Sequence, residues 1–218
     1  MSCNGTIAYE GDDTFYSCPT GDNGGWNIYL KPVKGQDKCM PVWLKADACF
    51  SGCAPTTTPS NLIGTNFEFP HLIVHVDEKH RDKALGNSLN GLAAGSKSSI
   101  FNFDIPASDA GKTCSLKFLL PAEGTMETSN YKLSGNGSFE FAILQEPATK
   151  DTTYETMPKV HDYLNDFELV PGNAYTVSSY PCPAGGSVGI WMYATGDAKL
   201  EYFQDFNPCP VGLYVTVE

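Results

Sequence analysis

The sequence predicts an all-β protein: an antiparallel β-sandwich with a disulfide-rich N-terminal appendage. Three observations predict this fold. The chain of 218 residues holds 21 Gly, 15 Pro, 11 Tyr and 12 Phe, a composition that favours short strands joined by tight turns. Apolar and polar residues alternate in many short segments that Gly, Pro, Asn or Asp terminate. Eight cysteines are spread over loop-like contexts, which is typical of a disulfide framework.

The first part of the chain holds five of the eight cysteines. We expect strands at Thr14–Ser17, Trp26–Leu30 and Val42–Lys45, with the first two joined as a hairpin by the turn residues 21–25. The polar Pro/Thr segment 54–60 is the one plausible boundary, because its composition is that of a linker. We therefore divide the chain into a cysteine-rich N-terminal segment, residues 1–58, and a sandwich domain, residues 59–218.

Strand signals recur along the second part at the spacing of a sandwich. We expect less than about one-tenth helix, against roughly 30–35% in an average domain. The stretch 78–92 has no clean period and is expected to be loop with at most one helical turn. The nine expected strands are His71–Val76, Ser99–Phe103, Ser115–Leu120, Ser138–Leu144, Asp166–Leu169, Tyr175–Ser179, Val188–Tyr193, Lys199–Phe203 and Gly212–Val217.

The cysteines predict an oxidising compartment and constrain the domain organisation. If all are paired, at least one disulfide joins the two parts, because five cysteines precede the boundary and three follow it. The N-terminal segment is then expected to pack on the main unit. Cys114 and Cys182 lie at the edges of predicted strands, each beside a turn signal, and we pair them with each other. The eight are Cys3, Cys18, Cys39, Cys49, Cys53, Cys114, Cys182 and Cys209.

Charge and hydropathy exclude several partners. The formal net charge is −11, which repels the phosphates of nucleic acids and anionic membrane surfaces. The longest apolar run, around Leu72–Val74, is too short to span a bilayer. The sequons at Asn4 and Asn136 are consistent with a secreted glycoprotein. Since no signal peptide is visible, we expect a secreted or cell-wall protein in its mature form, with an added Met1.

From Asn66 onward the chain resembles the C-terminal "But-two" domain of many secreted fungal proteins, a domain named for a partner of the NEDD8-activating enzyme. The matching stretches are residues 67–74 (FEFPHLIV), 99–106 (SIFNFDIP), 111–116 (GKTCSL) and 202–208 (YFQDFNP). Residues 15–19 and 26–29 are similar to the cysteine-rich segments often found ahead of that domain. The family pattern often carries a small residue where this chain has Cys209. The resemblance therefore implies an additional disulfide partner for Cys209, with Cys49 or Cys53 as first candidates.

A more distant similarity is to extracellular jelly-roll modules, some of which bind polysaccharide. It rests on residues 103–106, the strand from Cys114 to Leu120, residues 152–158 and residues 212–215. The similarity implies two facing antiparallel sheets. It implies a polysaccharide ligand only by analogy, because one sandwich fold hosts many functions.

The residues themselves suggest no catalytic group. Residues 185–189 fit the G-x-S-x-G pattern of serine hydrolases around Ser187, but a nucleophile elbow needs a strand before the serine and a helix after it. Here a turn precedes Ser187 and a strand follows. A hydrolase or lyase acting on polysaccharide remains an alternative that would require two convergent carboxylates or a metal ion.

Weak metal candidates are His71 and His75, which would share one face of a strand, and Asp104 at a strand end. A structural His71, a surface His75 and a turn-capping Asp104 are the favoured interpretation. Acidic residues at Asp12, Asp13, Asp109 and Asp151 do not match the spaced calcium loop. We therefore predict no cofactor, while leaving a structural calcium ion open.

Trp191 and Tyr193 alternate with Val188, Ile190 and Met192 and so lie on the opposite face of a strand. Together with Tyr154 they are candidates for stacking on sugar rings. Core packing of Trp191 and Tyr193 is the favoured interpretation, and each of the three Trp is expected to serve the core. The sequence thus favours a non-catalytic cell-wall or extracellular protein that binds a polysaccharide. A protein-interaction module, such as a virulence factor that binds a host protein, is the other alternative, and a contiguous exposed apolar patch would indicate it.

Overall fold

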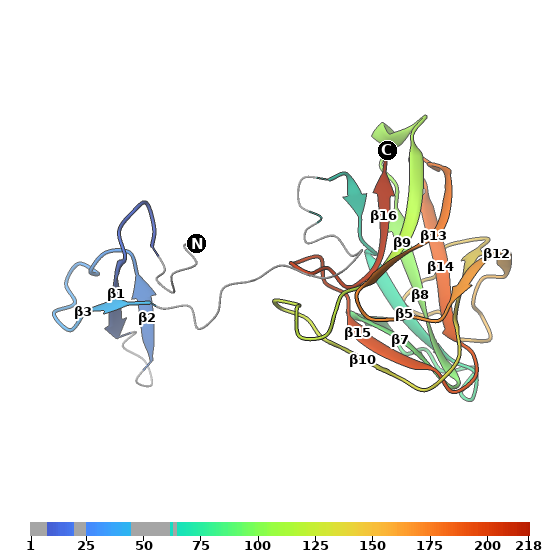
Figure 1. Cartoon of the computed structure of the whole chain (residues 1–218), viewed down its shortest axis with the longest axis horizontal. Coiled ribbons are helices and arrows are strands. Elements are labelled where there is room, and N and C mark those ends of the chain that lie inside the picture. Colours follow the sequence, from blue (N-terminus) through green and yellow to red (C-terminus); the bar gives the residue numbers. More distant parts are fainter. Residues whose placement is uncertain (1–7, 20–24, 45–61, 63–64) are drawn as a thin grey trace. The chain divides into compact units, whose positions relative to one another are not determined.

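The computed structural model describes residues 8–19, 25–44, 62 and 65–218, which form two compact units (Figure 1). Both units consist of antiparallel strands and turns. The described residues contain no α-helix and one short 3-10 turn, Ala107–Asp109. The all-β prediction and the low helix content are therefore confirmed. The expected boundary after residue 58 lies outside the described residues, and the packing of the first unit on the second stays a prediction.

The first unit is a three-stranded sheet in the order β2-β1-β3. β1 (Thr14–Pro19) pairs with β2 (Trp26–Tyr29) as the expected hairpin and with β3 (Met40–Trp43) on its other side. A disulfide joins Cys18 to Cys39, and Cys18 is fully buried. Trp26 and Trp43 are 48% and 61% exposed, so the expectation that every Trp serves a core is wrong for these two. Among the described residues of this unit, no second layer covers these rings.

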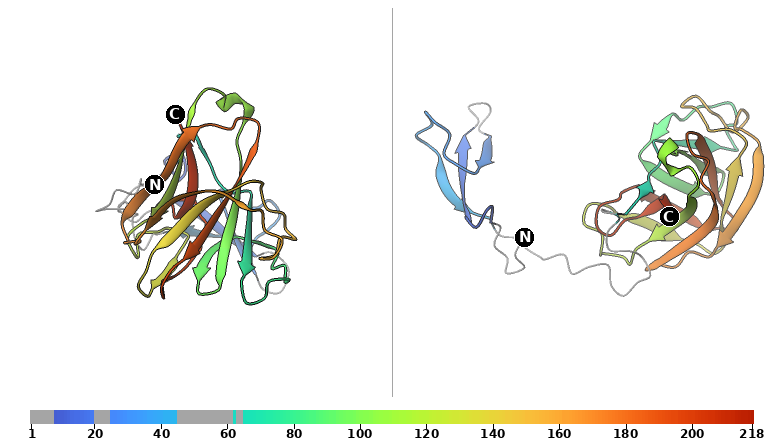
Figure 2. Two further views of the ribbon diagram at one scale, coloured as in Figure 1. Left: turned by 90° about the vertical axis from the view of Figure 1, so that its right-hand side faces the viewer. Right: turned by 90° about the horizontal axis from the view of Figure 1, so that it is seen from above.

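The second unit consists of two antiparallel sheets that form a sandwich, as Figures 1 and 2 show. Seven strands of the larger sheet follow the order β10-β15-β7-β8-β14-β11-β12, and β5 pairs with both β8 and β6. The smaller sheet has the order β13-β9-β16-β4. The larger sheet contains β5 (Leu72–Asp77), β6 (Asn87–Ser88), β7 (Asn90–Ala94), β8 (Lys97–Asp104), β10 (Tyr131–Ser134), β11 (Phe139–Leu144), β12 (Val160–Phe167), β14 (Ser187–Ala194) and β15 (Lys199–Phe203). The smaller contains β4 (Phe67–Glu68), β9 (Thr113–Leu120), β13 (Asn173–Pro181) and β16 (Gly212–Val217).

The core lies between the two sheets and follows the period of two that the sequence shows. Every second residue of a strand points inward, so each sheet contributes one apolar face. The ring of Phe118 on β9 contacts Phe141 on β11 and Tyr202 on β15, with centroids 5.8 and 5.5 Å apart. The inward residues include Phe101, Phe103, Ile190 and Met192 from the larger sheet and Leu116, Leu213 and Val215 from the smaller.

A second apolar cluster lies on the outer face of the larger sheet. Val74, Val76 and Ile100 point outward there and contact the segment that follows β11. Asn102 fixes this segment from within the sheet: its amide donates to the Ala148 carbonyl at 2.7 Å and accepts from the Ala148 N–H at 3.0 Å. Because Asn102 is buried, these two bonds satisfy an amide that would otherwise be costly to desolvate.

Several strands differ from the sequence expectation. β12 begins at Val160, whereas we expected a strand only from Asp166, because its residues on this edge strand are mainly polar and show no alternation. β6 and the start of β7 lie in the stretch 78–92, which was expected to be loop or helical turn. β7 pairs with β15 over its whole length. Its small residues Gly91, Ala93 and Ala94 carry little strand propensity, so cross-strand pairing determines its conformation. β10 was also not predicted.

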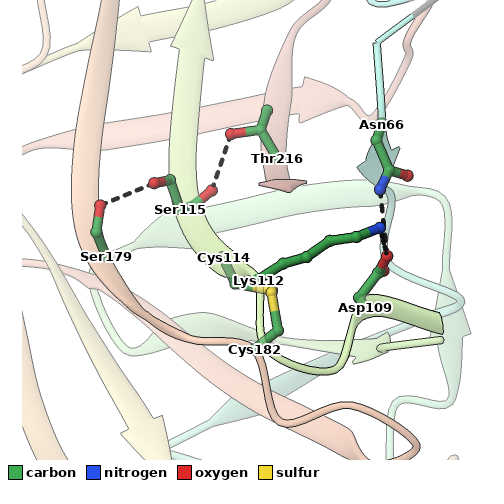
Figure 3. The surroundings of a disulfide bond; sticks show 8 residues. All are labelled: Asn66, Asp109, Lys112, Cys114, Ser115, Ser179, Cys182 and Thr216. Carbon is green, nitrogen blue, oxygen red and sulfur yellow. Dashed lines mark hydrogen bonds and ion pairs between the residues drawn. A yellow bond between two sulfur atoms is a disulfide. The ribbon is translucent and has the colours of Figure 1, made fainter. Parts of the chain in front are cut away.

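A disulfide lies at one end of the smaller sheet. Cys114 at the start of β9 is joined to Cys182 after β13, which confirms the predicted pair. Beside it, Lys112 and Asn66 both donate to Asp109, at 2.7 and 3.3 Å (Figure 3). Cys209 is also disulfide-bonded. The candidate partners Cys49 and Cys53 lie outside the described residues, so that link stays a prediction.

Candidate functional site

Two aromatic rings stack on the outer face of the larger sheet. Trp191 and Tyr193 alternate with the inward Ile190 and Met192 of β14, and their ring centroids are 4.2 Å apart with planes 28° apart. The Trp191 indole N–H donates to Ser98 on the neighbouring β8 at 2.9 Å. The face predicted for Trp191 and Tyr193 is the one that the structure gives them.

β11, which pairs with β14, and β12, which pairs with β11, add further polar and aromatic groups to this face. Glu140 on β11 pairs with Tyr193 on one side and with Asp166 of β12 on the other. In the adjacent row, Ala142 pairs with Trp191 and with Tyr163, whose side chain is 63% exposed. We call Trp191, Tyr193, Tyr163, Glu140 and Asp166 the outer aromatic surface.

The pKa of Tyr193 reflects its contacts with the neighbouring residues of this surface. Partial burial raises the pKa of the Tyr193 hydroxyl above its ordinary value. Its hydrogen bond to the Glu140 carboxylate and the charge of Asp166 raise this pKa further. Tyr193 therefore stays protonated and donates its hydrogen bond to Glu140. Tyr163, Glu140 and Asp166 are not predicted as site residues by the sequence, because the register shifts of the edge strand β12 leave no pattern that would place them together.

Tyr154 and Trp191 also have a structural role. Both pack against the cluster of Val74, Val76, Ile100, Leu144 and Ala148 on the outer face. The Arg81 guanidinium lies 4.7 Å from the centre of the Tyr154 ring, which covers that ring from one side. The core packing expected of Trp191 is thus found, in the cluster on the outer face of the sheet. Carbohydrate contact by Trp191, Tyr193 and Tyr154 stays a prediction.

Ser187 lies beside His71 and Asp104, but in the wrong order for a catalytic triad. The Ser187 hydroxyl donates to Asp104 at 2.5 Å, and the His71 imidazole contacts the other oxygen of Asp104 at 3.0 Å. In a triad the histidine lies between the serine and the carboxylate, because it must accept the serine proton. Ser187 is also the first residue of a strand, β14, and not of a helix. The arrangement fixes three chain segments at one end of the larger sheet.

The residues considered as metal ligands each contact a different group of the protein. His75 contacts the Asn90 carbonyl at 2.8 Å, whereas His71 contacts Asp104 at 3.0 Å. Asp109 is held by Lys112 and Asn66. Within the described part of the chain, no three His, Cys, Asp or Glu side chains gather closely enough to hold a metal ion.

Two cavities among the described residues do not hold the pair of carboxylates that a glycosidase needs, because each is lined by one carboxylate, Asp205 or Glu218. Burial raises the pKa of Glu68, and the nearby Asp109 and Asp104 raise it further. None of these three carboxylates lines either of two cavities that the described residues form, of about 410 and 450 Å³. A retaining or inverting glycosidase holds its two carboxylates across one cleft.

The glycosylation candidate Asn136 lies in an exposed turn between β10 and β11. Its backbone N–H donates to Asp197 at 2.8 Å, which fixes the turn. An exposed turn is the usual setting of a glycosylated sequon, so the position fits this prediction without testing it. Asn4 lies outside the described residues.

Two protein families have models that match parts of this chain. Residues 68–208, more than half of the chain, match the family model described as "Ubiquitin 3 binding protein But2 C-terminal domain". The chain belongs to this family, as the resemblance implied. Residues 1–42 are similar to the C-terminal domain of PIR1-like cell wall mannoproteins. No curated protein matches the chain.

These matches indicate a cell-wall or extracellular protein. The structure adds that no helix among the described residues is long and apolar enough to cross a membrane.

Proposed function

We propose that this protein is a non-catalytic cell-wall protein that binds a neutral polysaccharide through its outer aromatic surface. One observation carries the proposal: in the stacked pair, Trp191 lies in register with the exposed Tyr163, and Tyr193 lies in register with the carboxylates Glu140 and Asp166. The similarity of residues 1–42 to a cell wall mannoprotein domain supports the setting.

The chemistry of a sugar fits this combination of groups. A pyranose ring has apolar C–H faces that stack on aromatic rings and a rim of hydroxyl groups that donate hydrogen bonds. Tyr163 and Trp191 are two strands apart, hence roughly 10 Å apart along the sheet. One polysaccharide chain can contact both rings while Glu140 and Asp166 accept bonds from its hydroxyls.

Charge selects among polysaccharides. The net charge of −11 and the two carboxylates on the surface oppose the binding of anionic glycans. The proposed ligand is therefore a neutral wall glycan such as a glucan or a mannan. No group on this surface requires a cofactor, so binding should not depend on calcium.

A glycan array read with and without a chelator tests the ligand class. We expect neutral glycans to bind equally in both conditions, with anionic glycans weak. Loss of all binding in chelator would show that a calcium ion is needed. Release of reducing ends from the bound glycan would instead support the hydrolase alternative.

Variants of the surface test its role. Tyr163→Ala and Tyr193→Ala should each weaken binding of the preferred neutral glycan by roughly 3- to 10-fold, which is the usual contribution of one aromatic stacking contact. Phe69→Ala is the matched control, because Phe69 is 51% exposed but lies outside this surface. Equal binding by all three variants and the wild-type protein would overturn the assignment of this surface.

A further inference from the structure

A groove of about 410 Å³ lies where two sequence motifs of the family meet. One wall is formed by residues 69–71, which lead into β5, and the other by residues 203–207, which begin at the last residue of β15. Asn87, Ser88 and Leu89 close one side, and Tyr214 of β16 contributes as well. These segments are far apart in the sequence, and the two sheets bring them together.

The groove is lined by apolar side chains that remain exposed. Leu89 is 66% exposed, Phe69 51%, and Phe203 and Phe206 39% each. A folded protein rarely leaves several large apolar side chains together in water unless they bind something. This is the contiguous apolar patch that would indicate a protein-interaction surface.

A series of ring contacts holds the exposed rings in place. Phe69 contacts Phe206 with centroids 5.7 Å apart, and Phe206 contacts Phe67 at 6.1 Å. Phe67 in turn contacts the fully buried Tyr214 at 5.9 Å. The exposed rings are thus connected to the core, and little side-chain entropy remains to be lost on binding.

The loop after β15 is fixed by its own hydrogen bonds. The Gln204 amide donates to the Leu213 carbonyl and accepts from the Leu213 N–H, both at 3.0 Å. Gly212 permits this approach: its φ is +113°, and a Cβ there would lie 2.1 Å from the Gln204 side-chain oxygen. Asp205 accepts from Thr128 and from the Asn207 N–H.

These bonds also decide which ligand the groove suits. Gln204, Asp205, Asn87 and Ser88 all direct side-chain atoms to protein partners, so few polar groups are left for the hydroxyls of a sugar. The groove therefore differs from the outer aromatic surface, where carboxylates lie beside exposed rings. An apolar side chain of a partner fits it better than a saccharide does.

The charges in and near the groove indicate which residues should flank the apolar side chain of a partner. None of the described residues that line the groove is Lys or Arg, whereas Asp205 lines it. Asp104, which is 66% exposed at its side chain, contacts the groove residue His71. With a net charge of −11 on the whole chain, a basic partner is attracted and an acidic one repelled.

We propose that this groove binds a protein segment in which an exposed Phe or Leu side chain is flanked by Lys or Arg. The aromatic or aliphatic side chain inserts between Leu89 and the rings of Phe69 and Phe206, and the basic flanks lie toward Asp104. The binding is non-covalent and independent of the proposed polysaccharide site.

Short synthetic peptides test this proposal on the full chain. Each peptide carries one anchor residue, Phe, Leu or Ser, between flanks of either Lys or Glu, and affinity is measured by fluorescence anisotropy. Peptides with a Phe or Leu anchor and Lys flanks should bind at least about tenfold more tightly than the Ser peptides, a difference typical of one buried anchor. The Glu-flanked peptides should bind more weakly at low salt, and the difference should shrink at high salt.

Two variants locate the binding. Leu89→Asp and Phe69→Ser change exposed side chains, so the fold should persist, and each should weaken peptide binding roughly tenfold. Val170→Asp is the matched control, because Val170 is 55% exposed and does not line the groove. Tyr193→Ala should leave peptide binding unchanged.

The proposal is overturned if Phe and Leu peptides bind no better than Ser peptides, or if Leu89→Asp binds like the wild-type protein. A competition experiment with a fluorescent apolar dye that binds in the groove gives a further test. The proposal is overturned if a soluble glucan or a fatty acid displaces this dye while the peptides do not. Those outcomes would assign the groove to a saccharide or to a lipid.

Discussion

The Tyr193 hydroxyl on β14 donates a hydrogen bond to the carboxylate of Glu140, the residue directly opposite it on β11. This cross-strand bond joins an aromatic ring of the proposed binding surface to one of its acceptors. It explains, after burial, why the pKa of Tyr193 lies above its ordinary value, since the carboxylate stabilises the protonated phenol.

Glu140→Gln should therefore lower the pKa of Tyr193 while leaving the stacked rings in place. A neutral amide accepts the same hydrogen bond without opposing the negative charge of the phenolate. NMR of ¹³C-labelled tyrosine across an alkaline titration measures the change. Glu201→Gln on β15 is the control and should leave the Tyr193 titration as in the wild-type protein. An unchanged titration in Glu140→Gln would show that the contact is absent in solution.

Asp77 should make the second unit sensitive to acid. Its buried carboxylate is 2.8 Å from the His80 imidazole and accepts from the Lys79 N–H at 3.0 Å. The hydrogen bond with His80 is the main cause that lowers the pKa of Asp77 to about 2. A carboxyl with a depressed folded pKa stabilises the fold above its unfolded pKa near 3.8, and this stabilisation is lost as the pH falls toward 2.

The free energy of unfolding of the wild-type protein should thus fall more steeply between about pH 4 and pH 2 than that of Asp77→Asn. Urea unfolding at several pH values measures this slope. Asp82→Asn, which changes an exposed carboxyl in the same loop, should keep the wild-type slope. Parallel curves for Asp77→Asn and the wild-type protein would contradict the account.

The disulfide between Cys114 and Cys182 should stabilise the sandwich substantially. It closes a loop with a sequence separation of 68 residues, which corresponds to about 4 kcal/mol in the chain-entropy estimate. The double variant Cys114→Ala with Cys182→Ala should lose about that much unfolding free energy. Ser179→Ala, which removes only the exposed Ser115–Ser179 hydrogen bond nearby, should change it by less than about 1 kcal/mol. Equal stability of both variants would show that strand pairing alone holds this edge (Figure 3).

Peptide mapping without reduction should recover Cys209 in a disulfide with a peptide from the N-terminal segment that carries Cys49 or Cys53. Cys209 is disulfide-bonded, and the four other cysteines among the described residues are paired with each other. A free thiol at Cys209, or a link from Cys209 to Cys182, would contradict this expectation. In that case the N-terminal segment would be joined to the sandwich by its linker alone.

The sequence predicted what depends on local periodicity and missed what depends on pairing. The alternation of Trp191 and Tyr193 with Ile190 and Met192 gave their face correctly, because a strand has a fixed period of two. Tyr163 carried no such signal, since β12 has register shifts on a polar edge. Only the sheet order shows that Tyr163 lies across Ala142 from Trp191.

The groove could not be predicted from the sequence, because it also depends on contacts between distant segments. Phe69 and Phe206 each belong to a motif that the sequence analysis singled out, but their contact at 5.7 Å depends on how the two sheets close at one end. The exposure of Trp26 and Trp43 was also missed, because hydrophobicity predicts burial only where a second layer exists to cover the residue.

Polysaccharide binding at the outer aromatic surface is tested most directly by an NMR titration of the full chain with the neutral glycan that binds best on the array. Of the three Trp indole N–H signals, that of Trp191 is distinguished by its donation to Ser98, and Trp191→Phe identifies it. If glycan binds at the outer aromatic surface, the Trp191 indole signal and the ring signals of Tyr193 and Tyr163 should shift together and saturate with bound glycan. A glycan that saturates the protein while these three residues stay unshifted would contradict polysaccharide binding at the outer aromatic surface.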